Sequence, residues 1–381
     1  MISFSRAALV HAMFGLLIVA GCGAGAGAGG TAPAKASGEE AKGDANESNA
    51  PENTPAGPPK DVDCGDFTTC AIATDGLARC WGRDKEGELG DGKGRERSKR
   101  GVVPGIGKVK KVALASRFGC AILEDNTVKC WGSGRIANDG KMVSDAKPTL
   151  VAGVDQVEEL VASGAIACAR GSKGIACWGA DEKTIGTPPK GKFTQLAAGF
   201  THACALGANG AVTCWGAADW GGSGVFAKPP VTGAVQVVTG DRHGCVLTKG
   251  HTVQCWGMND AGQLGIKSDM EAHKKLVTVP GITGVVRLAA GEASTCALLG
   301  DGSVRCWGSN GEGELGLGTR SSDERPARVT ALSDVDQICL ASAHGCALTK
   351  QSKLLCWGSN AFGQLGDGTK ERRPAPTPVV W

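Results

Sequence analysis

Short stretches of mixed apolar and polar residues, separated by glycine-rich turns, fill the chain from about residue 61 to its end. One example runs from Leu288 to Leu299 and resumes from Ser303 to Trp307, with Gly300-Asp301-Gly302 between the two stretches. An Asp-Gly pair between two such stretches is a strong signal for a β-hairpin. A turn-rich loop and a stretch rich in Pro and Val follow, which predicts about four short strands in the segment.

This segment occurs seven times, at intervals of about 36 to 51 residues, and such a period is typical of solenoids and propellers. Seven four-stranded sheets arranged radially form a β-propeller, and closing the ring removes exposed sheet edges. The 60 glycines agree with this, since glycine disfavours long helices. We predict an all-β fold, a seven-bladed β-propeller with four-stranded blades, over residues 61–381.

The first 60 residues have a different character. The basic Arg6 precedes an apolar run from Ala7 to Ala20 that is too short to span a bilayer, which predicts a signal peptide over residues 1–21. The following residues up to 60 contain no Ile, Leu, Val or aromatic residue, so residues 22–60 are expected to be a disordered tether.

The end of the apolar run, Val19-Ala20-Gly21-Cys22, resembles the bacterial lipobox. The resemblance implies lipidation of Cys22 and an exported lipoprotein of the cell envelope that contacts the membrane through this lipid only. Gly23 after the lipidated cysteine favours the outer membrane, facing either the periplasm or the surface. The alternative is simple secretion with an incidental cysteine.

The chain has 17 cysteines, which indicates an oxidising compartment. In the hairpin above, a three-residue loop with Gly302 in the left-handed conformation places Cys296 opposite Cys306 as a close, non-hydrogen-bonded pair. One copy is a residue shorter, and a two-residue turn at Ser172-Lys173 restores the same opposition. We therefore expect seven hairpin disulfides, Cys70–Cys80, Cys120–Cys130, Cys168–Cys177, Cys204–Cys214, Cys245–Cys255, Cys296–Cys306 and Cys346–Cys356.

Two further cysteines, Cys64 and Cys339, fall on the innermost strands of the first and last copies. A closed ring makes these copies neighbours, which favours a Cys64–Cys339 disulfide, although a one-residue offset would turn one side chain away. Metal binding is the weaker interpretation of the cysteines, because their spacing lacks the CxxC pattern of zinc sites. Buried free thiols are the third interpretation.

Three motifs recur in the copies, namely Ala-Ala-Gly-x-x-x-x-Cys-Ala-Leu, Asp-Gly-x-Val-x-Cys-Trp-Gly and Gly-Gln/Glu-Leu-Gly. The last occurs at residues 87–90, 262–265, 313–316 and 363–366. Over residues 61–381 the chain resembles the repeat family of regulator of chromosome condensation. That family implies a propeller, and its members include a nuclear exchange factor for a small GTPase and a secreted inhibitor of β-lactamases. Export argues against the guanine-nucleotide exchange function.

We find no residue set that predicts catalysis. The sequence contains no phosphate-binding loop, no HExxH and no G-x-S-x-G motif. Asp75, Asp125 and Asp301 precede turn residues and are interpreted as turn formers. His202, His243 and His344 share one repeat position and suggest either a metal site or, as we favour, a structural role. We expect no catalytic residue, metal or cofactor, and a carbohydrate-active enzyme with paired carboxylates is the disfavoured alternative.

The Gly-x-Leu-Gly loop is degenerate in three consecutive copies, at residues 133–139, 181–186 and 217–221. Loops freed from a structural pattern are candidate contact loops. Candidate partner-binding residues are Trp220, Asp219, Arg135 and Ile136, although Trp220 could equally pack on its own blade. A basic run between residues 93 and 111 is read either as a contact for an anionic surface or as a solvated loop.

The net charge of +3 gives no indication of nucleic-acid binding. The sequence thus predicts a monomeric protein-binding or scaffold module with an unidentified protein partner and no catalysis. The first alternative is a secreted inhibitor of a hydrolase such as a β-lactamase.

Overall fold

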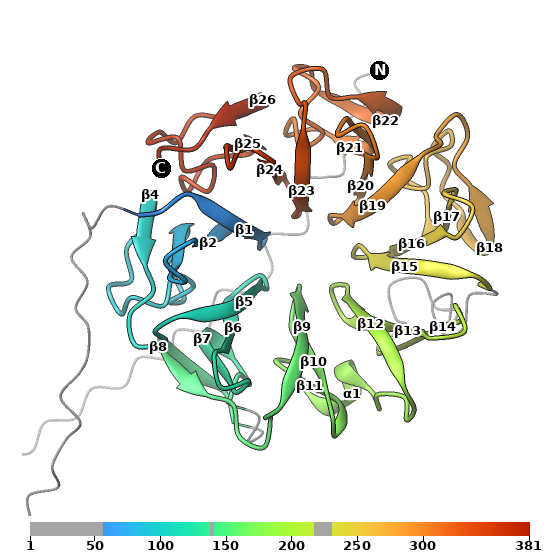
Figure 1. Ribbon diagram of the computed structural model, residues 1–381. Coiled ribbons are helices and arrows are strands. Elements are labelled where there is room, and N and C mark those ends of the chain that lie inside the picture. The colour runs from blue at the N-terminus through green and yellow to red at the C-terminus, as the bar shows by residue number, and fades with distance from the viewer. Residues whose placement is uncertain (1–55, 138–140, 217–230) are drawn as a thin grey trace, which may run out of the picture. The chain divides into compact units, whose positions relative to one another are not determined.

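The computed structural model describes residues 56–137, 141–216 and 231–381, whose strands form seven antiparallel sheets arranged radially around one axis (Figure 1). The seven-bladed β-propeller is therefore confirmed. Five blades have four strands. Blade 1 contains β1 (Pro59–Cys64), β2 (Thr68–Ala73), β3 (Ala78–Gly82) and β4 (Arg97–Val102). Blade 2 contains β5 (Val109–Leu114), β6 (Phe118–Leu123), β7 (Val128–Gly134) and β8 (Val143–Leu150).

The remaining blades follow in chain order. Blades 3 and 4 have three strands each within the described residues, β9 (Val157–Ser163), β10 (Ile166–Gly171) and β11 (Gly174–Trp178), then β12 (Phe193–Ala198), β13 (His202–Gly207) and β14 (Val212–Gly216). Blade 5 contains β15 (Ala234–Thr239), β16 (His243–Thr248), β17 (Val253–Met258) and β18 (Ala272–Thr278). Blade 6 contains β19 (Val285–Ala290), β20 (Ser294–Leu299), β21 (Val304–Asn310) and β22 (Ser321–Arg328). Blade 7 contains β23 (Val335–Leu340), β24 (His344–Thr349), β25 (Leu354–Gly358) and β26 (Arg373–Pro378).

Two details differ from the sequence prediction. The propeller begins at Pro59 rather than at residue 61, because Pro59 already pairs with Ala73 across the first hairpin. In blade 3 a short helix, α1 (Glu182–Ile185), follows the third strand, and no fourth strand is present among its described residues. Within the described ranges, no helix is long and apolar enough to cross a membrane.

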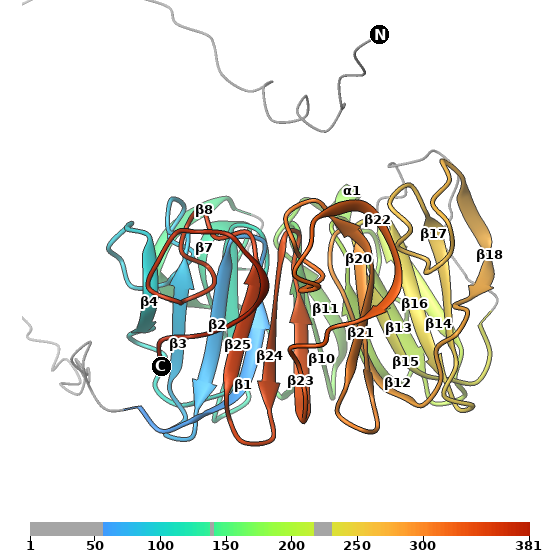
Figure 2. The same ribbon diagram turned by 90° about the horizontal axis from the view of Figure 1, so that it is seen from above.

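Strand alternation gives the propeller two distinct faces (Figure 2). The loop face carries the turns between first and second strands, such as residues 65–67, and the longer loops between third and fourth strands, such as residues 83–96. The hairpin face carries the turns between second and third strands, such as residues 74–77, and the links between blades. The first strand of every blade lies at the axis, so equivalent residues of different copies meet around it.

The hairpins have the geometry that their sequence indicates. Gly302 has a φ of 79°, and the Leu299 amide donates to the Ser303 carbonyl at 2.9 Å across the three-residue loop. Cys296 and Cys306 are directly paired with a Cα–Cα distance of 4.1 Å. The shorter copy pairs Cys168 with Cys177 in the same way. All seven hairpins carry a disulfide.

The core lies between neighbouring blades, where the Cys-Trp-Gly tryptophans are packed. In the regular copies the indole N–H of each tryptophan donates to the carbonyl of the Glu or Gln in the Gly-x-Leu-Gly loop of the preceding blade. The four pairs are Trp81 with Gln364 at 2.9 Å, Trp131 with Glu88 at 2.8 Å, Trp307 with Gln263 at 2.9 Å, and Trp357 with Glu314 at 2.7 Å. The motif thus links each regular blade to the next.

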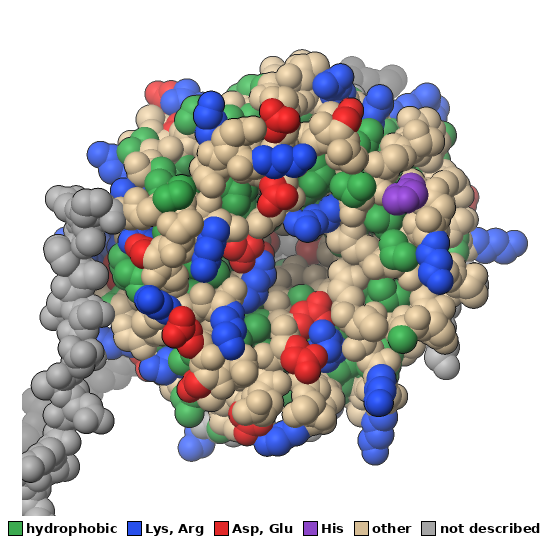
Figure 3. All heavy atoms as spheres, in the orientation of Figure 1, with side chains coloured by type: hydrophobic (Ala, Val, Ile, Leu, Met, Phe, Trp, Pro, Cys, Tyr) green, Lys and Arg blue, Asp and Glu red, His purple; other side chains and the backbone are tan. Residues whose placement is uncertain are grey.

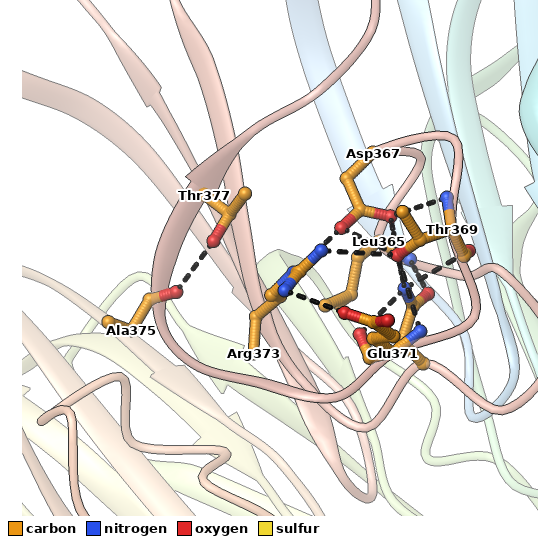
Figure 4. A network of polar contacts seen from close by, with 8 residues as sticks. Leu365, Asp367, Thr369, Glu371, Arg373, Ala375 and Thr377 are labelled. Carbon is orange, nitrogen blue, oxygen red and sulfur yellow. Dashed lines mark hydrogen bonds and ion pairs between the residues drawn. The ribbon is translucent and has the colours of Figure 1, made fainter.

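In the four regular blades, a buried Asn or Asp two residues after the Trp-Gly pair holds these loops in shape. In blade 7 the Asn360 Oδ1 accepts from the Leu365 amide at 3.0 Å, and its Nδ2 donates to the Glu371 carbonyl at 3.0 Å. Asp367, Thr369 and Arg373 complete this network (Figure 4). Equivalent bonds run from the amides of Leu89, Leu264 and Leu315 to Asp84, Asn259 and Asn310.

Each blade comes from one continuous stretch of chain, so the ring closes through side chains rather than through a shared sheet. Cys64 of β1 and Cys339 of β23 form a disulfide with a Cα–Cα distance of 5.6 Å. On the outside of the same seam, the Trp381 indole donates to the Gly57 carbonyl at 2.9 Å. The two ends of the propeller chain are therefore joined both near the axis, by the disulfide, and at the outer edge of the seam, by the hydrogen bond.

Candidate functional site

Of the four candidate partner-binding residues, the structure describes Arg135 and Ile136, which lie on the loop face of blade 2. Trp220 and Asp219 lie outside the described residues. Arg135 is partly buried, and its amide donates to the Gly179 carbonyl at 3.0 Å. Ile136 is 0% exposed and packs in a core cluster with Trp178, so the expectation that its side chain contacts a partner was wrong.

The physical reason lies in the loop length. The degenerate loop of blade 2 is shorter than a regular one, and Ile136 fills the space between blades that Leu89 or Leu365 fills elsewhere. Ile185 of α1 has the same role in blade 3, where it is 7% exposed. The degenerate loops of blades 2 and 3 therefore keep an apolar residue between the blades. Blade 2 has Gly134 where the regular loops have a buried Asn or Asp, and in blade 3 Asp181 at this position is exposed and accepts from the Thr184 amide at 2.8 Å.

Two tryptophans next to the degenerate loops differ from those of the regular copies within the described residues. The indole nitrogens of Trp178 and Trp256 are buried and have no partner among the described residues. Trp178 follows the degenerate loop of blade 2, and Trp256 follows that of blade 4. Sequence reasoning missed this consequence, although the absence of Gly-x-Leu-Gly before these copies was the available signal.

The three histidines at the equivalent repeat position are buried. The Nε2 atom of His344 lies 2.9 Å from the Thr69 hydroxyl of blade 1, and that of His243 lies 2.9 Å from the Thr295 hydroxyl of blade 6. Burial lowers the pKa of His344 to about 4 and, with His202 nearby, that of His243 to about 3. Neutral, buried rings at the seams between blades support the structural interpretation.

One potential metal cluster includes a histidine. Donor atoms of Cys64, His344 and Cys346 lie within 4.8 Å of one another, and this is the one such group within the described part of the chain. Both sulfurs are in disulfides, whereas metals bind the thiolate. In the oxidised protein the group therefore belongs to the ring closure.

The innermost strands of all seven blades together form the wall of the axial channel. At one position of the first strand, each blade has a long polar side chain, namely Asp61, Lys111, Glu159, Gln195, Gln236, Arg287 and Gln337. These residues lie near the hairpin face, which is hollowed at its centre and surrounded by charged side chains (Figure 3).

Two of these side chains form hydrogen bonds with the backbone N–H and C=O groups at the edge of the next blade's first strand. The Gln195 amide donates to the Val237 carbonyl at 3.1 Å and accepts from the Val237 amide at 2.9 Å. Gln236 makes the same two bonds to Leu288, at 3.1 and 2.8 Å. An unpaired strand edge would otherwise leave polar groups without partners. The ring of polar residues therefore has a structural function at this end.

The axis encloses a cavity of about 240 Å³ that is lined by the first strands of all seven blades. Its loop-face end contains four acidic residues, Asp63, Asp66, Asp241 and Glu292, and one basic residue lies deeper, Lys111. The Lys111 ammonium pairs with Asp61 at 2.9 Å. The cavity is thus acidic towards the loop face.

Ionisation of these carboxyl groups is disfavoured by their surroundings. Burial raises the pKa of Asp63 to about 7, against the opposing effect of Lys111. Burial also raises the pKa of Asp66, and burial together with the nearby charges of Glu292 and Asp66 raises the pKa of Asp241 well above its ordinary value. Sequence analysis did not identify this cluster, because its members come from three different copies and lie at the end of β1 or in the turns after the first strands.

The basic run noted in the sequence does not form one patch. Arg97 pairs with Asp91 at 3.1 Å near the loop face, whereas Lys110 donates to Asn126 at 2.6 Å on the hairpin face. Between them β4 crosses from one face to the other, and the Cζ atom of Arg100 lies 5.3 Å from the centroid of the Trp381 ring. The structure therefore separates the run into local contacts.

These features define a class of protein, the seven-bladed β-propeller whose blades are stapled by disulfides. Two sequence profiles of the regulator of chromosome condensation (RCC1) repeat match the chain, one at residues 60–88, 193–219, 234–263, 285–314 and 335–364, the other at 301–348 and 351–381. The chain belongs to the family of RCC1-repeat proteins. The density of its disulfides indicates an oxidising environment outside the cytosol.

Solved structures show the same fold. Prp20p from Saccharomyces cerevisiae has a TM-score of 0.71 and 20% identity, covering 83% of this chain and 88% of that chain. The yeast RCC1 protein (Prp20) with Kap60 bound gives 0.68 and 20%, covering 91% and 89%. The ectodomain of the receptor kinase CR4 from Physcomitrella patens gives 0.55 and 20%, covering 78% and 73%. At this identity the likeness concerns the fold alone.

Proposed function

We propose that this protein is a non-catalytic recognition module of the cell envelope, which binds a protein partner through its loop face. The observation that carries the proposal is the grouping of the degenerate loops. Three consecutive blades lack the Gly-Gln/Glu-Leu-Gly motif after the third strand, and β7, β11 and β14, which precede these segments, all end on the loop face. Loops held on a rigid scaffold but free to vary in sequence are where binding residues concentrate.

Relatives of the same fold support protein binding as the general role. Prp20p is described by its binding to Gsp1p and histones, and the second yeast structure has Kap60 bound. We carry over only the general property that such a propeller can bind proteins. Exchange on a small GTPase is disfavoured, because the disulfides and the N-terminal sequence both favour an exported chain.

The N-terminal sequence supports the location. We propose that the Val19-Ala20-Gly21-Cys22 sequence is processed so that Cys22 carries a lipid, which would anchor the propeller to a bacterial envelope membrane, the outer membrane being favoured. One lipidated residue followed by a polar tether would hold the module near the membrane without further contact.

The test is affinity capture with matched variants. The full chain is immobilised in oxidised form and exposed to envelope extract of its source organism, in parallel with Arg135→Glu and Arg320→Glu. Arg135 lies on the degenerate arc, and Arg320 lies on the regular loop of blade 6, where its Nε atom donates to the Gly311 carbonyl. We expect one retained protein that is lost with Arg135→Glu and kept with Arg320→Glu. The converse pattern, or no retained protein, counts against the proposal.

The same experiment also tests the alternative function, inhibition of a hydrolase. If the retained protein is a hydrolase such as a β-lactamase, stoichiometric loss of its activity on adding the full chain distinguishes inhibition from simple scaffolding. Loss of that inhibition with Arg135→Glu would place the inhibitory contact on the same arc.

A further inference from the structure

The loop-face end of the axial cavity contains acidic side chains that the described residues pair only in part. Asp66 and Asp241 come from equivalent turns of blades 1 and 5, and Glu292 comes from that turn in blade 6. Asp66 accepts a hydrogen bond from the Ser116 hydroxyl. The guanidinium next to Asp241, that of Arg242, pairs instead with Asp260 at 2.5 Å. Among the described residues, the Asp241 carboxylate has no hydrogen bond and no ion pair.

A second and independent observation comes from a neutral side chain. Thr239 lines the same cavity, two residues before Asp241, and is 6% exposed. Its hydroxyl oxygen has no hydrogen-bond partner within the described residues. Buried hydroxyl groups are normally hydrogen-bonded, since leaving one unpaired costs about 1–3 kcal/mol. The hydroxyl therefore points to a polar ligand in the cavity.

The spacing of the carboxylates identifies the class of ligand. A calcium or magnesium ion needs several oxygens at about 2.0–2.6 Å from one centre. No three carboxylates of the described residues have oxygens within 4.8 Å of one another. An ammonium or guanidinium group is larger and carries several N–H donors that point in different directions. Such a group suits acceptors that are spread around a cavity.

The charge along the axis indicates the direction of entry. Lys111 and Arg287 belong to the hairpin-face end of the channel wall, whereas Asp66, Asp241 and Glu292 surround the loop-face end. A cation approaching from the loop face meets acidic residues alone, whereas at the hairpin face the acidic Asp61 and Glu159 are balanced by Lys111 and Arg287. The loop face is also the face of the degenerate arc.

We propose that the axial cavity binds one organic cation from the loop face, the ammonium or guanidinium group of a basic side chain presented by the protein partner, between Asp241, Asp66 and the Thr239 hydroxyl. This deepens the proposed recognition function and rests on it for the source of the cation. The chemistry itself is independent of any partner.

The experiment is calorimetric titration of the full chain with four probes at constant ionic strength. N-acetylarginine amide represents a peptide side chain, putrescine represents a free amine, N-acetylcitrulline amide is the neutral match of the first, and Ca²⁺ tests metal binding. We expect the arginine probe to bind, the citrulline probe and Ca²⁺ not to bind, and the Asp241→Asn variant to weaken binding at least tenfold.

Two further variants are measured, of which the first is a control and the second tests the role of the Thr239 hydroxyl. Asp301→Asn removes the same charge from an exposed hairpin turn on the opposite face, and we expect its affinity for the arginine probe to remain within twofold of wild type. Thr239→Val removes the unpaired hydroxyl without a change of charge, and we expect weaker binding with no loss of thermal stability. The Asp241 carboxylate makes no hydrogen bond to any residue that the structure describes, so we expect Asp241→Asn to fold normally.

The outcomes separate the two proposals. Tighter binding of the arginine probe assigns the site to a peptide side chain, and tighter binding of putrescine assigns it to free amines. Equal binding of the citrulline and arginine probes, or unchanged binding by Asp241→Asn, overturns the cation site even if a partner is captured. If the arginine probe binds but no protein is captured, only the recognition function fails.

Discussion

The Trp81 indole N–H donates to the backbone carbonyl of Gln364 at 2.9 Å, although the two residues are 283 positions apart in the sequence. The same carbonyl accepts from the Thr69 hydroxyl at 2.8 Å, and that hydroxyl lies 2.9 Å from His344 Nε2. Because Thr69 donates to the carbonyl, it accepts from the histidine. A polar chain made of residues from both ends of the protein thus lies within the closing seam.

The contribution of the Trp81–Gln364 hydrogen bond to stability can be measured, because Trp178 provides a buried tryptophan for comparison. Trp81→Phe removes the indole donor, and Trp178→Phe makes the same change at a tryptophan whose Nε1 atom has no partner among the described residues. Both variants lose similar volume, so their difference reports the hydrogen bond. We expect Trp81→Phe to lower the free energy of unfolding by about 1 kcal/mol more than Trp178→Phe. Equilibrium unfolding in urea measures both, and equal losses would refute the assigned role of the bond.

The ring-closing disulfide should stabilise the fold more than a hairpin disulfide. Cys64 and Cys339 are 275 residues apart, whereas Cys204 and Cys214 are 10 apart. On the chain-entropy model the longer loop contributes about 5–6 kcal/mol and the shorter one about 3 kcal/mol. We expect the Cys64→Ser/Cys339→Ser protein to unfold at lower denaturant concentration than the Cys204→Ser/Cys214→Ser protein. The reverse order would show that local hairpin geometry outweighs ring closure.

The C-terminal strand closes the outer part of the same seam. A chain that ends at Lys370 lacks β26 and Trp381, and therefore loses the pairing with β25 and the bond to the Gly57 carbonyl. We expect a lower melting temperature by calorimetry, with Trp381→Ala giving a smaller decrease in the same direction. A truncated chain that melts with the full one would contradict this account of closure.

The pH dependence of stability should reveal Asp63. Its pKa is raised from 3.8 to about 7 by burial, so the folded state holds a proton that the unfolded state releases. The favourable contribution is complete below about pH 4 and is lost as the pH rises through 7. Asp63→Asn removes this titration while keeping an acceptor for the Leu114 amide.

The expected result is a melting temperature for Asp63→Asn that exceeds the wild-type value at pH 8 and converges with it near pH 4. Thermal unfolding across this range makes the comparison. The buried histidines act in the opposite sense, because their lowered pKa values reduce stability as the pH falls from about 6.5 towards 4. They are present in both proteins, so the difference between the two curves isolates Asp63.

Local pattern was sufficient to predict the blades. Gly302 and the two loop lengths determine which cysteines face each other, and these are relations between neighbours in sequence. The copy number and the pairing of Cys64 with Cys339 also followed from repeat position. The prediction for Ile136 failed because an apolar residue in a loop can fill the seam between blades, and sequence alone did not show how the shorter loop reaches it.

The axial features could not be predicted in the same way. Gln195 and Gln236 each bind the backbone of the following blade, so their role depends on the angle between sheets. Asp66 and Asp241 are separated by many residues and meet only after the ring closes. A repeat reveals what every copy shares, whereas the cavity is made by the positions at which the copies differ.

The distribution of bonds between blades has a mechanical consequence. The joint between blades 7 and 1, where an open-ended ring would be weakest, is held by a covalent link, the Trp81 and Thr69 bonds, and the clasp of Trp381 on Gly57. Among the described residues, the joints before Trp178 and Trp256 have no such indole bond. Under thermal or mechanical load, we therefore expect these joints, which lie next to the loops that we assign to recognition, to separate before the joint between blades 7 and 1.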